Sequence, residues 1–291
     1  NVPAYIFPES AARALGAMWR QRQRRERPQG RVPTFKTDDA AVEQILDAAL
    51  VAGRARLSEP ESLRLLEAYG IPVTPWVFVS QDGGQSLAPA AGEAARKLGF
   101  PVAIKIVSPA IIHKTDVGGV TLDLDSEDAV GRAVRSMVRK VSQAAPEGRP
   151  QIEGILVQRM APNGRETIVG LTRMPRMGSL VMFGLGGVYV EILRDVVLRL
   201  SPLRDSDADE MLREVRTYRL LEGVRGEPPR DLKALTNALL RVSQLAQRHP
   251  RIAELDINPL LALEKGAVAV DARVQLEANE GDQGRSEEGR A

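Results

Sequence analysis

Apolar positions recur at helical spacing in several segments of the chain. Between Leu87 and Leu98 they fall at i, i+3, i+4 and i+7, and Gly99 and Pro101 follow, so we expect a helix that ends there. Similar patterns predict the other helices: "FPESAARALGAMWRQ", Asp38 to Val51, "LSEPESLRLLEAYGIP" with Ser58 as N-cap, a helix through Val130 and Val141 capped near Ser126, a short helix opening at Ser206, and Asp231 to Gln247.

Short segments of alternating or continuous apolar residues predict strands between these helices. They are "VTPWVFVS", "VAIKIVS", "GGVTLDLD", "GILVQRM", "ETIVGL", "SLVMFG", "DVVLRL", "AELDINPLL" and "AVAVDARV". Helices and strands are mixed, with a run of consecutive strands in the middle. This order favours two α+β lobes over one doubly wound sheet.

The composition fits a globular protein of more than one unit. With 291 residues the chain exceeds the usual single-domain size, and 43% hydrophobic and 27% charged residues are ordinary proportions. The sequence contains no signal-peptide pattern and no run of 18 apolar residues. Zero cysteines exclude disulfides, and we expect a cytoplasmic location. Because the first residue is Asn1, we interpret the chain as a processed product or part of a longer polypeptide.

The net charge of +2 argues against a nucleic-acid-binding surface over the whole molecule. One local exception is Arg20 to Arg31, with six arginines and one glutamate. This stretch is either a contact for nucleic acid or a membrane surface, or a solvated helix end that runs into the linker "RPQGRVPTF". Few aromatic residues lie among these arginines, so we favour the solvated end and expect no nucleic-acid or membrane partner.

A lysine interrupts the strand "PVAIKI". Val102, Ile104 and Ile106 share one face, and Lys105 lies on the other with Ala103. Lys105 is therefore either a cation directed at a ligand or the charge of an edge strand.

Acidic and amide side chains alternate with apolar ones near the end of the chain. Glu254, Asp256 and Asn258 share one strand face, opposite Leu255, Ile257 and Pro259, and in the next strand Asp271 and Arg273 oppose Val268, Val270, Ala272 and Val274. If the two strands pair as a hairpin, two carboxylates and an amide oxygen converge, a donor set that suits Mg²⁺. The alternative is an ordinary antiparallel pair with its polar side chains toward solvent.

Two glycine-rich stretches, "AIIHKTDVGGV" (Ala110–Val120) and "FGLGGVYVE" (Phe183–Glu191), could bring the backbone close to phosphate. Neither has the Walker A spacing or the G-x-G-x-x-G pattern, so the glycines alone favour a tight turn over a phosphate site in each stretch. The first stretch contains His113, one of two histidines. We expect the other, His249, to be a surface residue at a helix C-terminus.

Together these motifs resemble a known family. "LLEAYGIPV", "PVAIKIVSPAIIHKTDVGGV", "GILVQRMAPNGRETIVG", "FGLGGVYVE", "ELDINPLLA" and "AVDARV" occur in the order found in the ATP-grasp part of NDP-forming acyl-CoA synthetases, relatives of the succinyl-CoA synthetase β subunit. The resemblance covers Leu57 to Val274. It implies the ATP-grasp fold, in which two α+β lobes hold a nucleotide between them.

The resemblance also implies a domain plan. Residues 1–27 look like the end of a CoA-ligase domain, and 28–56 form a linker and helix. Residues 57–276 form the ATP-grasp domain, with a small lobe over roughly 73–158 and a larger lobe over 159–276, and 277–291 form a disordered tail. The CoA-binding and CoA-ligase domains would lie upstream, in the same polypeptide or in a separate subunit, and we expect an oligomer in the full form.

Roles for individual residues follow from the same resemblance. The expected nucleotide contacts are Lys105, His113, Lys114, Thr115, Gly118, Gly119, the hinge residues Gln158, Arg159, Met160 and Ala161, and Glu166. Asn258 and Asp271 match the Mg²⁺ ligands, and Asp256 lies beside them. His113, Glu191 and Asp256 are the expected catalytic residues, with His113 in a position that is phosphorylated in some members.

The family reaction is acyl-CoA + ADP + phosphate ⇌ acid + ATP + CoA, and the ATP-grasp part transfers the phosphoryl group between histidine and ADP. The motifs leave the acid and the nucleotide base open. Two alternatives remain: a regulatory nucleotide sensor from a protein lysine acetyltransferase, and an ATP-grasp ligase that activates a carboxylate directly. The intact glycine pair, "DINP" and "DAR" favour the synthetase over the sensor, and "HKTDVGGV" argues against the direct ligase.

Overall fold

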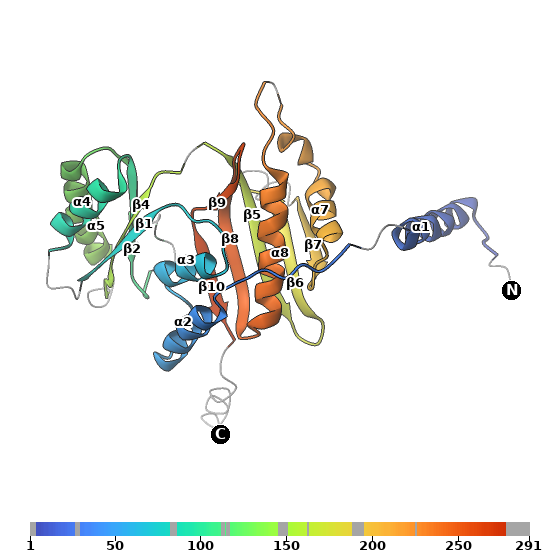
Figure 1. Cartoon of the computed structure of the whole chain (residues 1–291), viewed down its shortest axis with the longest axis horizontal. Helices are drawn as coiled ribbons and strands as arrows, with labels where there is room; N and C mark the ends of the chain where they lie inside the picture. Colours follow the sequence, from blue (N-terminus) through green and yellow to red (C-terminus); the bar gives the residue numbers. More distant parts are fainter. Residues whose placement is uncertain are drawn as a thin grey trace.

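The computed structural model describes residues 4–26, 30–81, 86–111, 114, 117–144, 151–161, 163–187, 195–224 and 226–277. These residues form two antiparallel sheets, each covered by helices (Figure 1). Two α+β lobes are thus confirmed. No helix within the described part of the chain is long and apolar enough to cross a membrane.

The smaller lobe contains a four-stranded sheet in the order β1-β4-β2-β3. Its strands are β1 (Trp76–Ser80), β2 (Val102–Val107), β3 (Val120–Leu124) and β4 (Gly154–Arg159). Helices α4 (Leu87–Leu98) and α5 (Glu127–Ala144) pack against the sheet. Apolar residues of β2 and β4 form one core with the alanine-rich face of α4 and the valines of α5, as the helical periodicity predicts.

The larger lobe contains a six-stranded sheet in the order β10-β8-β5-β6-β7, with β9 paired to β8. Its strands are β5 (Arg165–Met174), β6 (Gly178–Leu185), β7 (Val196–Leu200), β8 (Ile252–Ala262), β9 (Ala267–Ala269) and β10 (Ala272–Leu276). Helices α7 (Asp205–Glu214) and α8 (Leu232–Arg248) cover it, with the short 3₁₀ helix η2 (Tyr218–Leu220) after α7. Helix α7 begins one residue before Ser206, where we expected it.

Helices α2 (Asp39–Val51) and α3 (Glu59–Ala68) precede the small lobe in sequence but pack into the core of the large one. Helix α3 begins as predicted. Ser58 caps it, and the Glu61 carboxylate accepts a hydrogen bond from the Ser58 backbone N–H at 2.7 Å. Leu63 and Leu66 are fully buried, so the start of α3 is fixed to the large lobe.

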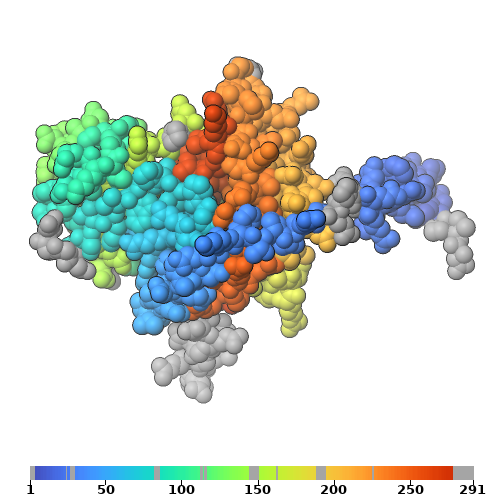
Figure 2. Space-filling view, in the orientation of Figure 1, coloured from blue at the N-terminus to red at the C-terminus, as the bar shows by residue number. Residues whose placement is uncertain are grey.

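Helix α1 (Pro8–Glu26) stands clear of both lobes in the space-filling view (Figure 2). Ile6, Leu15 and Trp19 are more than half exposed. The predicted linker that follows is held against the large lobe over its described part. Gln244 of α8 exchanges two hydrogen bonds with the backbone of Phe35, at 2.7 and 3.1 Å.

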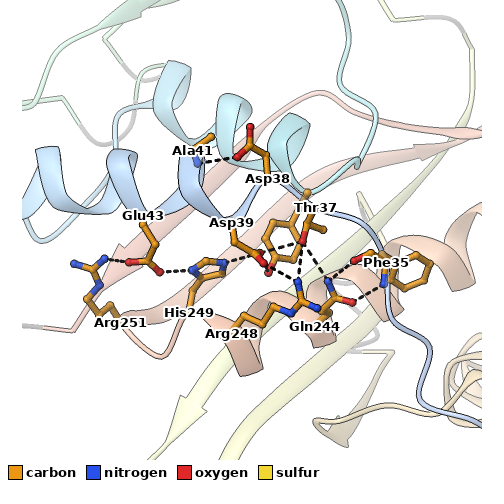
Figure 3. A network of polar contacts seen from close by, with 11 residues as sticks. Phe35, Thr37, Asp38, Asp39, Ala41, Glu43, Gln244, Arg248, His249 and Arg251 are labelled. Atoms are coloured by element: carbon orange, nitrogen blue, oxygen red, sulfur yellow. Dashed lines mark hydrogen bonds and ion pairs between the residues drawn. The ribbon is translucent and has the colours of Figure 1, made fainter.

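His249 corrects one sequence prediction. It is 2% exposed, not a surface residue, and its ring lies between Glu43 and Asp39, with Nδ1 2.6 Å from Glu43 Oε1 (Figure 3). The C-terminus of α8 faces the start of α2, which places two acids against the ring. Burial raises the pKa of Asp39, but hydrogen bonds from Thr37, Tyr69, His249 and Arg248 outweigh this effect and hold the pKa below its ordinary value.

Candidate functional site

Side chains of both lobes line a cavity of about 620 Å³. It lies where the start of α3, the end of β2, residues Asn258 and Pro259 of β8, and the connection between β9 and β10 meet. Its lining includes the charged and amide residues Glu59, Lys105, Lys114, Asn258 and Asp271. Four of these five were predicted as site residues, and the cavity brings Lys105 and Lys114 together with Asn258 and Asp271, which lie more than 140 residues later in the sequence.

Lys105 is buried, with 7% of its surface exposed, in a strand bonded on both sides. The edge-strand interpretation is therefore wrong. Its Nζ donates to Glu59 Oε1 at 2.6 Å and to the Val270 carbonyl oxygen at 3.2 Å. An ammonium group at this depth requires such partners, because an unpaired buried charge is strongly destabilising.

Lys114 reaches the same place from the loop that follows β2, and its Nζ donates to Glu59 Oε2. The glycine pair shapes the end of this loop. Gly118 has φ +68°, and a Cβ at Gly119 would lie 2.7 Å from Ile106 Cγ2 and 2.9 Å from the Lys114 carbonyl oxygen. Neither glycine lines the cavity, so the two glycines affect the site only through the backbone conformation of the loop that carries Lys114. His113 and Thr115 lie outside the described residues.

Glu59, which was not among the predicted site residues, joins the two lysines. Its side chain is 3% exposed. Burial raises the pKa of the Glu59 carboxyl, but attraction and hydrogen bonds from Lys105 and Lys114 outweigh burial and lower the pKa. A signal was present in the sequence. Leu63 and Leu66 stand four and seven residues after Glu59, so the apolar face of α3 carries this glutamate inward.

The predicted hairpin between the last strands is confirmed, because β8 pairs antiparallel with both β9 and β10. The predicted alternation across the second strand is partly wrong. The regular strand is interrupted between Ala269 and Ala272, although the Val270 N–H still donates to the Pro259 carbonyl at 3.0 Å. Ala269 is buried, whereas Val270 is only partly buried. This break turns the Val270 carbonyl toward Lys105 and Gln158, which both donate to it.

Asn258 and Asp271 line the cavity, but Asp256 does not. Asp256 forms a side-chain hydrogen bond with Asn258, so it can orient that amide from outside the cavity. Burial raises the pKa of Asp256, and attraction by Arg273 offsets this only in part. Burial and, after it, repulsion from Glu59 raise the pKa of Asp271.

Asn258 and Asp271 suit Mg²⁺ better than a metal ion whose ligands all come from protein side chains. The described residues contain no group of three or more His, Cys, Asp or Glu side chains arranged to hold a metal. Asn258 and Asp271 offer one amide and one carboxylate, both hard oxygen donors. Mg²⁺ accepts so few protein ligands because water and substrate phosphates complete its shell. A cation beside Asp271 would also favour the ionised form that burial disfavours.

The predicted hinge residues lie at the end of β4, where the chain passes toward β5. Gln158 is 1% exposed, and its Nε2 donates to Thr74 Oγ1 and, at 3.0 Å, to the Val270 carbonyl. The backbone N–H groups of Arg159 and Met160 donate to the carbonyls of Pro75 and Pro101. None of these residues, nor Ala161, lines the cavity. The hinge residues therefore connect the two lobes next to the cavity.

Glu166 lies on β5 against the glycine stretch that ends β6. The Gly186 backbone N–H donates to the Glu166 carbonyl at 2.8 Å, and a Cβ at Gly187 would lie 3.2 Å from Glu166 Oε2. The Glu166 carboxylate therefore faces the glycine backbone and not the cavity. Glu191 lies outside the described residues.

Cationic side chains that we did not predict also line the cavity, among them Arg54 and Arg273. The Arg54 guanidinium forms two 2.7 Å hydrogen bonds with the Glu61 carboxylate, which ties the loop before α3 to that helix. The cavity therefore combines several cations with the buried Glu59 carboxylate and the partly buried Asp271 carboxylate, a combination suited to a phosphorylated ligand that carries a divalent cation.

Comparisons with known proteins agree with this geometry. Residues 48–276 match the family model of an ATP-grasp domain. Over 278 residues the chain is 40% identical to the ADP-forming acetate–CoA ligase I of Archaeoglobus fulgidus, which covers 95% of this chain and 39% of that relative. Over 237 residues it is 41% identical to the beta subunit of the ADP-forming acetate–CoA ligase I of Pyrococcus furiosus, which covers 81% of this chain and 98% of that subunit.

A solved structure is also similar, with a TM-score of 0.70 and 42% identity over 81% of this chain and 100% of the other. It is the dinucleotide forming acetyl-coenzyme A synthetase 1 of Ca. Korarchaeum cryptofilum, in complex with coenzyme A and Mg-AMPPCP, its phosphohistidine segment pointing towards the nucleotide binding site. The present chain thus spans about two fifths of the A. fulgidus relative and nearly all of the P. furiosus beta subunit.

Proposed function

The chain belongs to the ATP-grasp family, among the ATP-grasp subunits and domains of ADP-forming acid–CoA ligases, and from this premise we propose that it performs the nucleotide step of such a ligase. The overall reaction is acyl-CoA + ADP + phosphate ⇌ acid + ATP + CoA. In the step assigned to this chain, the N–P bond of a phosphohistidine breaks, and an oxygen of the ADP β-phosphate forms the new O–P bond.

One observation carries the proposal: the cavity between the lobes is lined by Lys105 and Lys114 together with Asn258 and Asp271. Two ammonium groups can neutralise phosphate oxygens. An amide and a carboxylate can hold Mg²⁺, which would supply further neutralisation of phosphate charge when bound. This is the arrangement that phosphoryl transfer requires, since catalysis of that step depends on positioning and charge stabilisation.

The remaining residues take supporting roles in the proposal. Gln158 to Ala161 would hold the adenine ring beside the cavity, and Gly118 and Gly119 would close the loop over the phosphates. Asp256 would orient Asn258 through their hydrogen bond, and Glu166 would approach the nucleotide from the glycine stretch. We assign His113 as a possible phosphoryl carrier and Glu191 as a further catalytic residue.

The partners follow from the length of the relatives. Because the chain spans 39% of the A. fulgidus ligase, we propose that CoA-binding and CoA-ligase domains, upstream or in a separate subunit, bind CoA and the carboxylic acid. The phosphohistidine segment of the K. cryptofilum enzyme points towards its nucleotide site, which supports such a division of labour. The assembled enzyme would be an oligomer.

The proposal predicts that the 291-residue chain binds ADP or ATP with Mg²⁺ but does not form acyl-CoA alone. A coupled assay with acetate, CoA and ATP checks this, first with the chain alone and then with CoA-binding and CoA-ligase domains supplied. We expect turnover only in the second case. Full turnover by the chain alone would contradict the assignment of CoA chemistry to partner domains.

Labelled ATP separates the synthetase from a nucleotide sensor. With the partner domains present, transfer of the γ-phosphate into an acid-labile, histidine-bound form supports the synthetase. A second incubation with His113→Asn shows whether His113 itself carries the label. Nucleotide binding without any acid-labile label would favour the sensor instead.

A further inference from the structure

Glu59 is the one buried carboxylate in the described part of the cavity that contacts both phosphate-binding lysines, and the proposed function gives it no role. Each of its oxygens serves one lysine: Oε1 accepts from Lys105 and Oε2 accepts from Lys114. The two lysines come from different places, Lys105 from the middle of β2 and Lys114 from the loop after it. One carboxylate therefore fixes the position of two separate cations.

Glu59 is itself held firmly. It is the first residue of α3, and Pro60 follows it. Beside it, the Glu61 carboxylate accepts hydrogen bonds from the Ser58 backbone and from Arg54, all at 2.7 Å. The helix that carries these residues is anchored in the core of the large lobe through Leu63 and Leu66. The carboxylate is thus held by the large lobe, and both lysine side chains of the small lobe donate to it.

The two lysines keep capacity for a ligand while they contact Glu59. An ammonium group has three N–H donors. Described residues accept two of them at Lys105 and one at Lys114. Among the described residues the remaining N–H groups have no acceptor, so phosphate oxygens can accept from them without displacing Glu59. The attraction of the two lysines also lowers the pKa of Glu59 and keeps it ionised.

We propose that Glu59 is a positioning residue, which holds the ammonium groups of Lys105 and Lys114 in the geometry that receives the phosphates of a nucleoside diphosphate or triphosphate. This inference rests on the proposed function of the cavity as a nucleotide site. It assigns to Glu59 an effect on phosphate recognition and none on recognition of the nucleoside.

The test measures the affinities for ADP and for adenosine of the full chain that carries Glu59→Gln. The amide keeps the size of the side chain but removes the charge that the two lysines share. We expect ADP affinity to fall about 10- to 100-fold, as misplaced charged groups in a site produce, and adenosine affinity to change less than about twofold. Calorimetry gives the first value, and ligand-observed NMR competition gives the second.

Two further variants make the comparison interpretable. Glu67→Gln is a matched control, because Glu67 is an exposed acid on the same helix and does not line the cavity. We expect it to bind both ligands as the unmodified chain does. Glu59→Asp keeps the charge on a shorter side chain that cannot reach both lysines. It should weaken ADP binding less than Glu59→Gln does, and it carries the test if Glu59→Gln fails to fold.

The outcomes are distinct. Equal losses for ADP and adenosine would show that Glu59 only maintains the structure, and tighter ADP binding would show that it competes with phosphate. Either result overturns the inference and leaves the proposed function in place. Absence of ADP binding by the unmodified chain would overturn the proposed function and this inference with it.

Discussion

Buried and partly buried charges at the meeting point of the lobes determine the chemistry at the residue scale. Lys105, Lys114, Glu59 and Asp271 carry two positive and two negative formal charges when ionised, within one partly enclosed site. The pKa of Glu59 is lowered, whereas the pKa of Asp271 is raised. The lysines hold the Glu59 carboxyl in its ionised form, whereas burial and the neighbouring Glu59 disfavour the ionised form of Asp271. Asp271 is therefore the acid that gains most from an added cation.

Substitution of Asp271 tests this difference. Asp271→Asn replaces a carboxylate by a weaker, neutral donor, so we expect the affinity for Mg-ADP to fall about 10- to 100-fold while the affinity for ADP in EDTA stays within about twofold. Calorimetric titration under both conditions measures the effect. Glu254→Gln, on the exposed face of β8, is the control that should behave like the unmodified chain. Equal affinities of Asp271→Asn and the unmodified chain for Mg-ADP would remove Asp271 from the metal site.

At the scale of elements, irregular segments between regular strands build the site. The loop after β2 delivers Lys114, and the break between β9 and β10 delivers Asp271 and exposes the Val270 carbonyl. Gly119 controls the first of these segments. Its backbone carbonyl accepts from the Ile106 N–H at 2.8 Å, and its missing side chain leaves room for Ile106 and Lys114.

Gly119→Ala should disturb this loop. The added Cβ would be closer to Ile106 Cγ2 and to the Lys114 carbonyl than side chains tolerate, so the backbone around Lys114 must shift. We expect the free energy of unfolding to fall by about 1–3 kcal/mol, and ADP affinity to fall as well. Urea unfolding and calorimetry measure the two effects. Gly131→Ala, in α5, meets no atom closer than 3.5 Å, so it should leave ADP affinity unchanged and raise the free energy of unfolding by up to about 1 kcal/mol, because alanine is favoured over glycine inside a helix.

Regular elements were predictable from the sequence, whereas irregular ones were not. Helix α4 and the hairpin of the last strands follow from periodicity, because a buried face imposes its spacing on the sequence. The interruption at Val270 and Asp271 is not visible in the pattern of apolar residues, so we wrongly predicted that side chains alternate between the two faces without a break. Glu59 was missed because an acid in the first turn of a helix is also a common helix-stabilising feature. His249 was misplaced because only the tertiary packing of α8 against α2 buries it.

At the scale of the whole molecule, the site exists because the two lobes meet. Lys105 and Gln158 of the small lobe both donate to the Val270 carbonyl of the large lobe, and Glu59 pairs with Lys105 across the same boundary. Helices α2 and α3 precede the small lobe in sequence yet belong to the core of the large one. The chain therefore passes from large lobe to small lobe and back, and this path places the start of α3 opposite β2.

The most direct measurement of the central claim is a calorimetric titration of Mg-ADP into the unmodified chain and into Lys105→Met. Methionine keeps the length of the side chain but not its charge, and Lys114 still pairs with Glu59. We predict saturable binding of one ADP per unmodified chain, and an affinity about 10- to 100-fold lower in the variant, as expected for loss of a charged hydrogen bond. The claim that this cavity receives the nucleotide phosphates would be contradicted by equal affinities of the two proteins.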